Sequence, residues 1–221
     1  MRLAFFASGG GSNVGAILDA IDRGALHAEP ALLITDRAGI GVIDRAEARD
    51  IPTATIPLDP DEAAFSHTLL DALARAEADT VALAGYLRKI PDPVVWAFKG
   101  RILNVHPSLL PAFGGPGWYG RKVHQGVIDY GCRVTGATVH LVDSEYDTGP
   151  VVLQESVRVE PDDTAETLQQ RVLAVEHRIF PQALTLLASG RLRVDGRRVE
   201  VVDPPQASPP PLASSESPLS P

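Results

Sequence analysis

The sequence predicts an α/β protein with a doubly wound, mainly parallel sheet, an antiparallel edge and a C-terminal hairpin. Continuous apolar runs alternate with segments of helical periodicity through the first half of the chain, as in parallel sheets that helices cover on both faces. The first run leads directly into the glycine-rich segment S-G-G-G-S-N. Later runs alternate apolar and polar residues, which is typical of an antiparallel strand near a sheet edge.

Each element of the first half follows from its own pattern. Apolar runs predict strands at residues 3–7, 31–35, 54–57, 80–84 and 102–106. Helical spacing predicts helices at 14–21 and 43–49, a third that opens within 59–62 and runs to 76, and a fourth at 91–98. Ser12 or Asn13 is expected to cap the first helix. Strand, glycine loop and helix in this order favour an anion on backbone N–H groups.

The second half predicts a helix at 123–130, strands at 133–142 and 151–159, and an acidic loop between these strands. Asp163 and Glu166 form a predicted capping box for a long helix, which Pro181 should kink or divide. Glu176 lies within the apolar stripe of this helix, where a carboxylate needs a partner or a place at the stripe's margin. The Asp195-Gly196 pair predicts the terminal hairpin.

Composition restricts the class of protein. The formal net charge is −8, which argues against a nucleic-acid binder. The single cysteine, Cys132, suits a reducing compartment, and no apolar run is long enough to cross a bilayer, so we expect a cytoplasmic protein. Residues 1–202 are predicted to form one domain. Residues 203–221 form a Pro/Ser-rich tail that is expected to be disordered.

The strand at 102–106 carries the polar residues Asn104 and His106, which point to the same side because they lie two positions apart. Buried polar groups without partners cost about 1–3 kcal/mol each, so this pair needs partners or a ligand. Spacing alone leaves two interpretations open. One is a strand end with a satisfied histidine, and the other is a site.

The segment N-V-H-P-S-L-L-P, which begins at Asn104, resembles the signature of the folate-dependent formyltransferases, most closely those of purine synthesis. Three further segments share the likeness: S-G-G-G-S-N near the start, L-A-G-Y-L-R at 83–88 and G-A-T-V-H-L-V-D-S-E-Y-D-T-G-P at 136–150. The resemblance covers residues 1–202. It implies an enzyme that transfers the formyl group of 10-formyltetrahydrofolate to the amine of glycinamide ribonucleotide, as a monomer or homodimer.

The resemblance also implies roles for individual residues. Asn104 and a protonated His106 would donate hydrogen bonds to the oxyanion of a tetrahedral intermediate. Asp147 would raise the pKa of His106 and assist proton transfer. The ribonucleotide phosphate would lie on Gly11, Ser12 and Asn13, and Glu176 would hold the substrate amine. The folate would contact Leu87, Arg88, Lys89, Ile90, Asn104, Asp143, Ser144, Glu145 and Tyr146, with His140 near the site.

Two segments depart from the family pattern. Residues 59–65 read D-P-D-E-A-A-F, acidic where family members often carry a basic residue near the folate tail, so tail binding is expected to fall to Arg88 or Lys89. The loop at 114–122 is longer than in many relatives and is a candidate lid.

Other functions compete with this interpretation. Methionyl-tRNA formyltransferase would need a further C-terminal domain, and formyltetrahydrofolate hydrolase a regulatory domain ahead of the glycine loop. A dinucleotide-binding oxidoreductase is the alternative outside this chemistry, although the spacing of Gly9, Gly11 and Gly15 misses the G-x-G-x-x-G fingerprint and leaves Asp36 as its main support. A nucleotide-sensing module without catalytic turnover is a further alternative function. A zinc site of His106, His140 and Asp147 lacks a close-spaced ligand pair, so no metal is expected.

Overall fold

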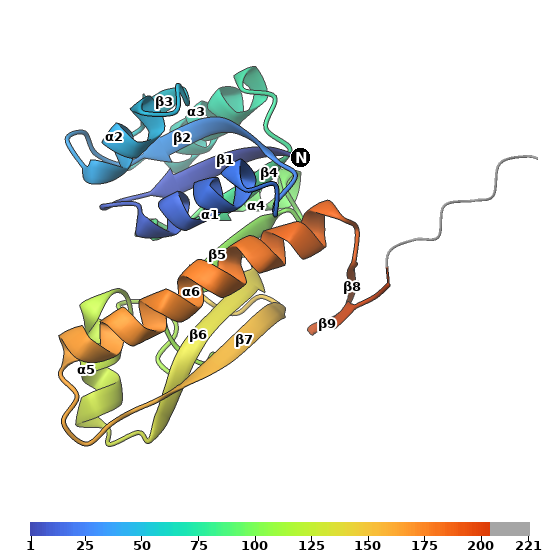
Figure 1. The fold of residues 1–221 in the computed structure, drawn as a ribbon. Coiled ribbons are helices and arrows are strands. Elements are labelled where there is room, and N and C mark those ends of the chain that lie inside the picture. The colour runs from blue at the N-terminus through green and yellow to red at the C-terminus, as the bar shows by residue number, and fades with distance from the viewer. Residues whose placement is uncertain (204–221) are drawn as a thin grey trace, which may run out of the picture.

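A seven-stranded sheet with the order β3-β2-β1-β4-β5-β6-β7 forms the centre of the computed structural model, which describes residues 1–203 (Figure 1). The strands are β1 (Arg2–Ala7), β2 (Glu29–Thr35), β3 (Thr53–Thr55), β4 (Thr80–Leu83), β5 (Ile102–His106), β6 (Val134–Leu141) and β7 (Val151–Arg158). The strands β1 to β5 pair in parallel, whereas β6 runs antiparallel to both β5 and β7. The predicted fold class is confirmed.

Helices cover both faces of this sheet because successive residues of a buried strand point to opposite sides. They are α1 (Ser12–Asp22), α2 (Gly41–Glu47), α3 (Glu62–Arg75), α4 (Asp92–Ala97), α5 (Arg121–Asp129) and α6 (Ala165–Ala188). In β1, Leu3 and Phe5 pack with α1 and α6, and Ala4 and Phe6 pack with α3 and α4. The two cores therefore lie on opposite faces, with α1 and α6 on one side and α3 and α4 on the other (Figure 1).

Strand order reverses at β1, which pairs with β2 on one side and with β4 on the other. Ligands of open α/β sheets bind at the carboxyl ends of the strands beside such a switch point. The glycine loop after β1, the loop after β4 and the polar end of β5 all lie at this edge. The order of the strands thus brings three of the four family-like segments together.

Two predicted details are wrong. The cap of α1 is Gly11, with φ 68°, and neither Ser12 nor Asn13 caps the helix. The capping box of α6 consists of Thr164 and Thr167 instead of Asp163 and Glu166. Pro181 lies inside α6 and does not divide it, so the kink is the part of that expectation that stays a prediction.

The C-terminal hairpin is confirmed: β8 (Leu192–Asp195) pairs antiparallel with β9 (Arg198–Val201). The predicted tail, apart from Asp203, lies outside the described residues. Within residues 1–203, no helix has the length and apolar character needed to cross a membrane.

Candidate active site

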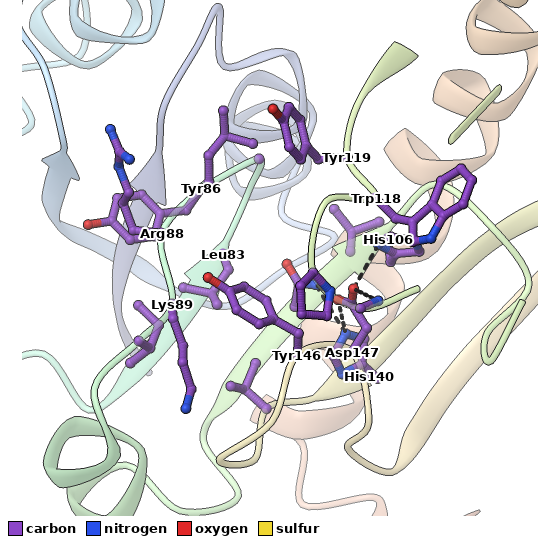
Figure 2. A pocket seen from close by; sticks show the side chains of 18 of the residues that line it. Leu83, Tyr86, Arg88, Lys89, His106, Trp118, Tyr119, His140, Tyr146 and Asp147 are labelled. Carbon is purple, nitrogen blue, oxygen red and sulfur yellow. Dashed lines mark hydrogen bonds and ion pairs between the residues drawn. The ribbon is translucent and has the colours of Figure 1, made fainter. Parts of the chain in front are cut away.

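A cavity of about 240 Å³ opens beside the carboxyl ends of β4 and β5 (Figure 2). Its wall comes from the loop after β4, the end of β5, the glycine-rich loop after β5 and the acidic loop between β6 and β7. Small-molecule pockets typically hold about 300–1,000 Å³, so this one would enclose only part of a ligand of that size. Every predicted folate contact except Ser144 lines it.

Two neighbouring strands position the polar residues of this cavity. Asn104 and His106 lie two residues apart on β5 and share a side of the sheet. His140 on β6 is paired with Asn104 across the antiparallel ladder, and residues opposite each other in a ladder share a face. Asp147 reaches the same point from the loop after β6, as Figure 2 shows. The structure thus brings together all three predicted catalytic residues and His140.

Hydrogen bonds determine the tautomer of His140 and the orientation of Asn104. The Nδ1 atom of His140 lies 2.8 Å from the carbonyl oxygen of Leu141, which can only accept, so Nδ1 carries the proton. In the neutral ring, Nε2 then accepts a hydrogen bond from Nδ2 of Asn104 at 3.0 Å. The same Asn104 nitrogen also donates to Oδ1 of Asp147 over 3.4 Å, near the outer limit of a hydrogen bond.

Asp147 is a largely buried carboxylate that accepts two hydrogen bonds and faces two histidine rings. Its Oδ2 accepts the backbone N–H of Gly115 at 2.9 Å and lies 3.5 Å from Nδ1 of His106. Its Oδ1 lies 3.6 Å from Nε2 of His140, which is a close electrostatic contact longer than a hydrogen bond. Burial alone would raise the pKa of Asp147, but His140, His106 and Gly115 together lower the pKa below its usual value. Asp147 is therefore ionised at neutral pH.

The buried ring of His106 makes contacts at both nitrogens. Its Nε2 donates to the carbonyl oxygen of Phe113 at 2.8 Å, and its Nδ1 faces Asp147. Burial lowers the pKa of His106 and outweighs Asp147, which raises it. The expected effect of Asp147 is thus present, but burial favours the neutral ring over the imidazolium. The neutral ring keeps its proton on Nε2 and turns the lone pair of Nδ1 toward the carboxylate.

The glycine loop lies outside this cavity, next to α6. A side chain at Gly11 would come within 2.3 Å of Val42, so α2 packs closely against the loop and requires glycine there. Asn13 is buried, and its amide Nδ2 donates to Oε2 of Glu176 at 2.6 Å. In residues 1–203, neither Glu176 nor the predicted phosphate-binding residues line the cavity. The structure pairs Glu176 with the predicted phosphate site.

Arg88 stands at the rim of the cavity, and Asp36 holds its side chain. Nε of Arg88 donates to Oδ2 of Asp36 at 2.8 Å, and Arg37 pairs with the same carboxylate at 2.9 Å. Burial would raise the pKa of Asp36, but hydrogen bonds from Arg37, Ser8 and Arg88 lower it to about 2. The two arginines thus share one buried carboxylate. Together the three side chains keep a net positive charge beside the mouth of the cavity.

Sequence reasoning missed several residues near the site. The carbonyl of Phe113 and the N–H of Gly115 are backbone groups, for which the sequence carries no signal. Arg45 of α2 donates from Nε to the carbonyl of Gly10, and only its helical position could have suggested this contact. His124 of α5 is fully buried, and this burial, with a smaller effect of the neighbouring His106, lowers its pKa to about 4. Its position on the apolar side of a predicted helix was the only sequence feature that could have indicated its burial.

Metal ligands do not gather in the described chain. Residues 1–203 contain no group of three or more His, Cys, Asp or Glu side chains placed to hold a metal ion. The titratable groups of the cavity instead contact one another and the backbone.

The chain is similar to known proteins in both its sequence and its structure. The family model described as formyl transferase matches residues 1–184. The chain belongs to the formyl transferase family. The predicted resemblance to folate-dependent formyltransferases is confirmed.

The relatives of this formyltransferase include enzymes of purine synthesis. It is 44% identical over 199 residues to the chloroplastic phosphoribosylglycinamide formyltransferase of Vigna unguiculata, covering 88% of this chain and 64% of that protein. It is 40% identical over 190 residues to the phosphoribosylglycinamide formyltransferase of Bacillus subtilis, covering 84% of this chain and 94% of the relative. The chain thus spans slightly less than two thirds of the plant relative's length and nearly all of the bacterial one's.

Solved structures agree with this family. The crystal structure of glycinamide ribonucleotide transformylase 1 from Symbiobacterium toebii matches with a TM-score of 0.87 and 40% identity, over 92% of this formyltransferase and 94% of that chain. A formyltetrahydrofolate deformylase from Pseudomonas syringae matches with a TM-score of 0.83 and 26% identity, over 91% of this chain and 66% of the other. The fold thus occurs in a transformylase and in a deformylase, and the transformylase has the higher identity of these two.

Proposed function

We propose that this formyltransferase transfers the formyl group of 10-formyltetrahydrofolate to the amine of glycinamide ribonucleotide. The contact set of Asn104, His106, His140 and Asp147 in one cavity carries the proposal, supported by transferase relatives at 40% identity or more. An ionised carboxylate beside a neutral imidazole and an amide donor suits attack of an amine on a carbonyl.

Asn104 is proposed to stabilise the developing oxyanion. When the amine attacks the formyl carbon, the carbonyl oxygen gains charge and needs hydrogen-bond donors. One N–H of Asn104 is held at 3.0 Å by His140, whereas the other makes only the 3.4 Å contact with Asp147. The weakly bonded N–H is the one that an oxyanion would attract.

The His106–Asp147 pair is proposed to take the proton that leaves the attacking nitrogen. The Nδ1 lone pair of neutral His106 faces the carboxylate across 3.5 Å, so either group can receive the proton. The resulting imidazolium would lie against the Asp147 anion, which stabilises it. Returning the proton to the departing folate nitrogen completes the transfer.

The surrounding contacts support a proposed position for each substrate. The ribonucleotide phosphate is proposed to bind at the N-terminus of α1, on Gly11, Ser12 and Asn13, because the first N–H groups of a helix lack intrahelical partners. Glu176 is proposed to bind the amine end of this substrate from beside Asn13. The folate is proposed to lie between residues 87–90 and the acidic loop, with Arg88 facing its glutamate tail. Cytoplasmic location and a monomeric or homodimeric state stay predictions.

Absorbance of the deformylated folate product tests this function directly. We expect turnover of 10-formyltetrahydrofolate only when glycinamide ribonucleotide is added. Equal turnover without the ribonucleotide would replace the proposal with a hydrolase. Absence of turnover together with enhanced NADH fluorescence on binding would indicate the dinucleotide alternative.

Replacing Glu176 with glutamine should weaken ribonucleotide binding by roughly 10- to 100-fold, the value of a hydrogen bond to a charged group. Asn13 can still donate to the glutamine oxygen, so the local packing is retained. Isothermal titration with the ribonucleotide measures the effect. Unchanged affinity would make Glu176 a structural residue.

The contribution of Glu176 to thermal stability is expected to depend on pH. Burial raises the pKa of Glu176 to about 7, although the Asn13 hydrogen bond lowers it in part. A carboxyl whose pKa is raised by folding stabilises the protein below its unfolded pKa, and this contribution is lost as pH rises toward 7. Unfolding temperatures from pH 5 to 8 should therefore fall in the wild type more than in Glu176→Gln.

A further inference from the structure

The indole of Trp118 lies directly on Gly126 of α5. A Cβ atom at Gly126 would lie 2.4 and 2.7 Å from carbons of this indole and 3.4 Å from the ring of Phe113. Gly126 has ordinary helical geometry, so its backbone does not require glycine, and alanine is the better helix former at such a position. The absence of a side chain at Gly126 therefore makes room for the indole of Trp118. We call this packing of Trp118 on Gly126 the seat.

Aromatic contacts extend from this seat to Phe113. The rings of Phe113 and Trp118 meet edge to face, with centroids 5.3 Å apart, and Tyr130 meets Phe113 in the same manner at 6.2 Å. Trp118 also lines the cavity, as His106 does. The loop is thus anchored at both ends by its own aromatic rings, Trp118 on Gly126 of α5 and Phe113 on Tyr130, which caps the end of that helix.

This loop supplies two backbone contacts to the proposed proton-transfer pair. The carbonyl of Phe113 accepts from Nε2 of His106 at 2.8 Å, and the N–H of Gly115 donates to Asp147 at 2.9 Å. The first contact selects the ring tautomer and the second fixes the carboxylate. Any displacement of the loop alters both contacts together.

We propose that Trp118, seated on Gly126, is a positioning residue that holds His106 and Asp147 in their reactive arrangement through the backbone of Phe113 and Gly115. The proposal rests on the proposed function for its catalytic consequence, whereas its structural part stands on the contacts alone. By holding the carbonyl of Phe113 in place, the seat favours the tautomer of His106 that carries its proton on Nε2. In this tautomer the unprotonated Nδ1 faces Asp147.

Replacing Gly126 with alanine tests the seat without truncating any side chain. The added methyl group must displace the indole, and alanine favours the helix, so we expect an unfolding temperature equal to or above that of the wild type. The control is Gln125→Ala, at an exposed position of the same helix. Trp118→Ala should reproduce the effect of Gly126→Ala, and Trp118→Phe should restore part of the wild-type behaviour.

Nitrogen NMR of the His106 ring provides a readout that does not depend on turnover. The groups that face His106 are Asp147, His140 and His124, from a loop, a strand and a helix. In Gly126→Ala we expect the Nε2-protonated form to lose its dominance and the pKa of His106 to move toward its usual value by roughly half a unit or more. The resonance is assigned by its loss in His106→Asn.

Kinetics then link the seat to catalysis. Misplacement of a reacting group by about 1 Å can cost a hundredfold, so kcat should fall roughly tenfold or more in Gly126→Ala. The acid limb of its pH profile should move with the NMR pKa, and KM for the ribonucleotide should stay unchanged. A His106 titration and tautomer equal to those of the wild type would overturn the inference. Inactive wild-type protein would refute the proposed function and leave the NMR comparison decisive for the seat.

Discussion

Asp147→Asn is expected to lower turnover by roughly 10²- to 10⁴-fold, the range for loss of a positioned acid–base group. Asparagine keeps the shape and can still accept the N–H of Gly115 through its oxygen. Because Gly115 and His106 face the same oxygen, Oδ2, the NH2 group of asparagine would replace Oδ1, which faces His140 and Asn104. The variant then carries no negative charge to stabilise an imidazolium or to accept the proton. Single-turnover rates at saturating substrates measure the loss.

A folded variant is needed for this comparison. The lowered pKa of Asp147 stabilises the folded state above the unfolded pKa of 3.8, and this contribution is lost as pH falls through the folded value. The variant should therefore unfold at a lower temperature near neutral pH and converge with the wild type in acid. Asp129→Asn removes an acid from α5 outside the cavity and should keep full turnover. Turnover near the wild-type rate in Asp147→Asn would exclude Asp147 from the mechanism.

The central pair of the site could be predicted because its signal is local. Asn104 and His106 are neighbours on one strand, and the period of a strand places them on one side without knowledge of the fold. His140 could be assigned only through the family resemblance. Its contact with Asn104 depends on the register between β5 and β6, which no local pattern specifies.

The errors at the glycine loop have a tertiary origin. Ser12 and Asn13 both have side chains that commonly cap helices, and local reasoning correctly favours them. The close approach of Val42 makes Gly11 the cap, and Glu176, far along the chain, takes the amide of Asn13. Packing between α1, α2 and α6 therefore outweighed the local preference of two residues.

The protonation state of His106 shows the same limit in electrostatic terms. A carboxylate neighbour was expected to raise the pKa, and Asp147 does act in that direction. Burial acts in the opposite direction and is larger, but burial depends on the loop at residues 113–120, whose course a glycine-rich sequence leaves undetermined. Charge partners can thus be inferred from motifs, whereas desolvation requires the folded structure.

Replacing Asn104 with alanine is expected to lower kcat by roughly 10²- to 10³-fold, the usual effect of losing one oxyanion donor. The change removes the donor to Asp147 and also leaves Nε2 of His140 without its partner. An unpaired buried group costs about 1–3 kcal/mol, so the free energy of unfolding should fall as well. Rates at saturating concentrations of both substrates, with thermal unfolding in parallel, separate the two effects.

Val105→Ala is the matched control for Asn104→Ala, because Val105 is the next residue of β5 and its side chain packs into the core on the other side of the sheet. It loses buried methyl groups and therefore stability, yet it leaves every donor of the cavity in place. If the two variants lose similar stability and only Asn104→Ala loses turnover, the loss belongs to the missing N–H. Equal turnover in both would contradict an oxyanion role for Asn104, since general weakening of β5 would then explain its effect.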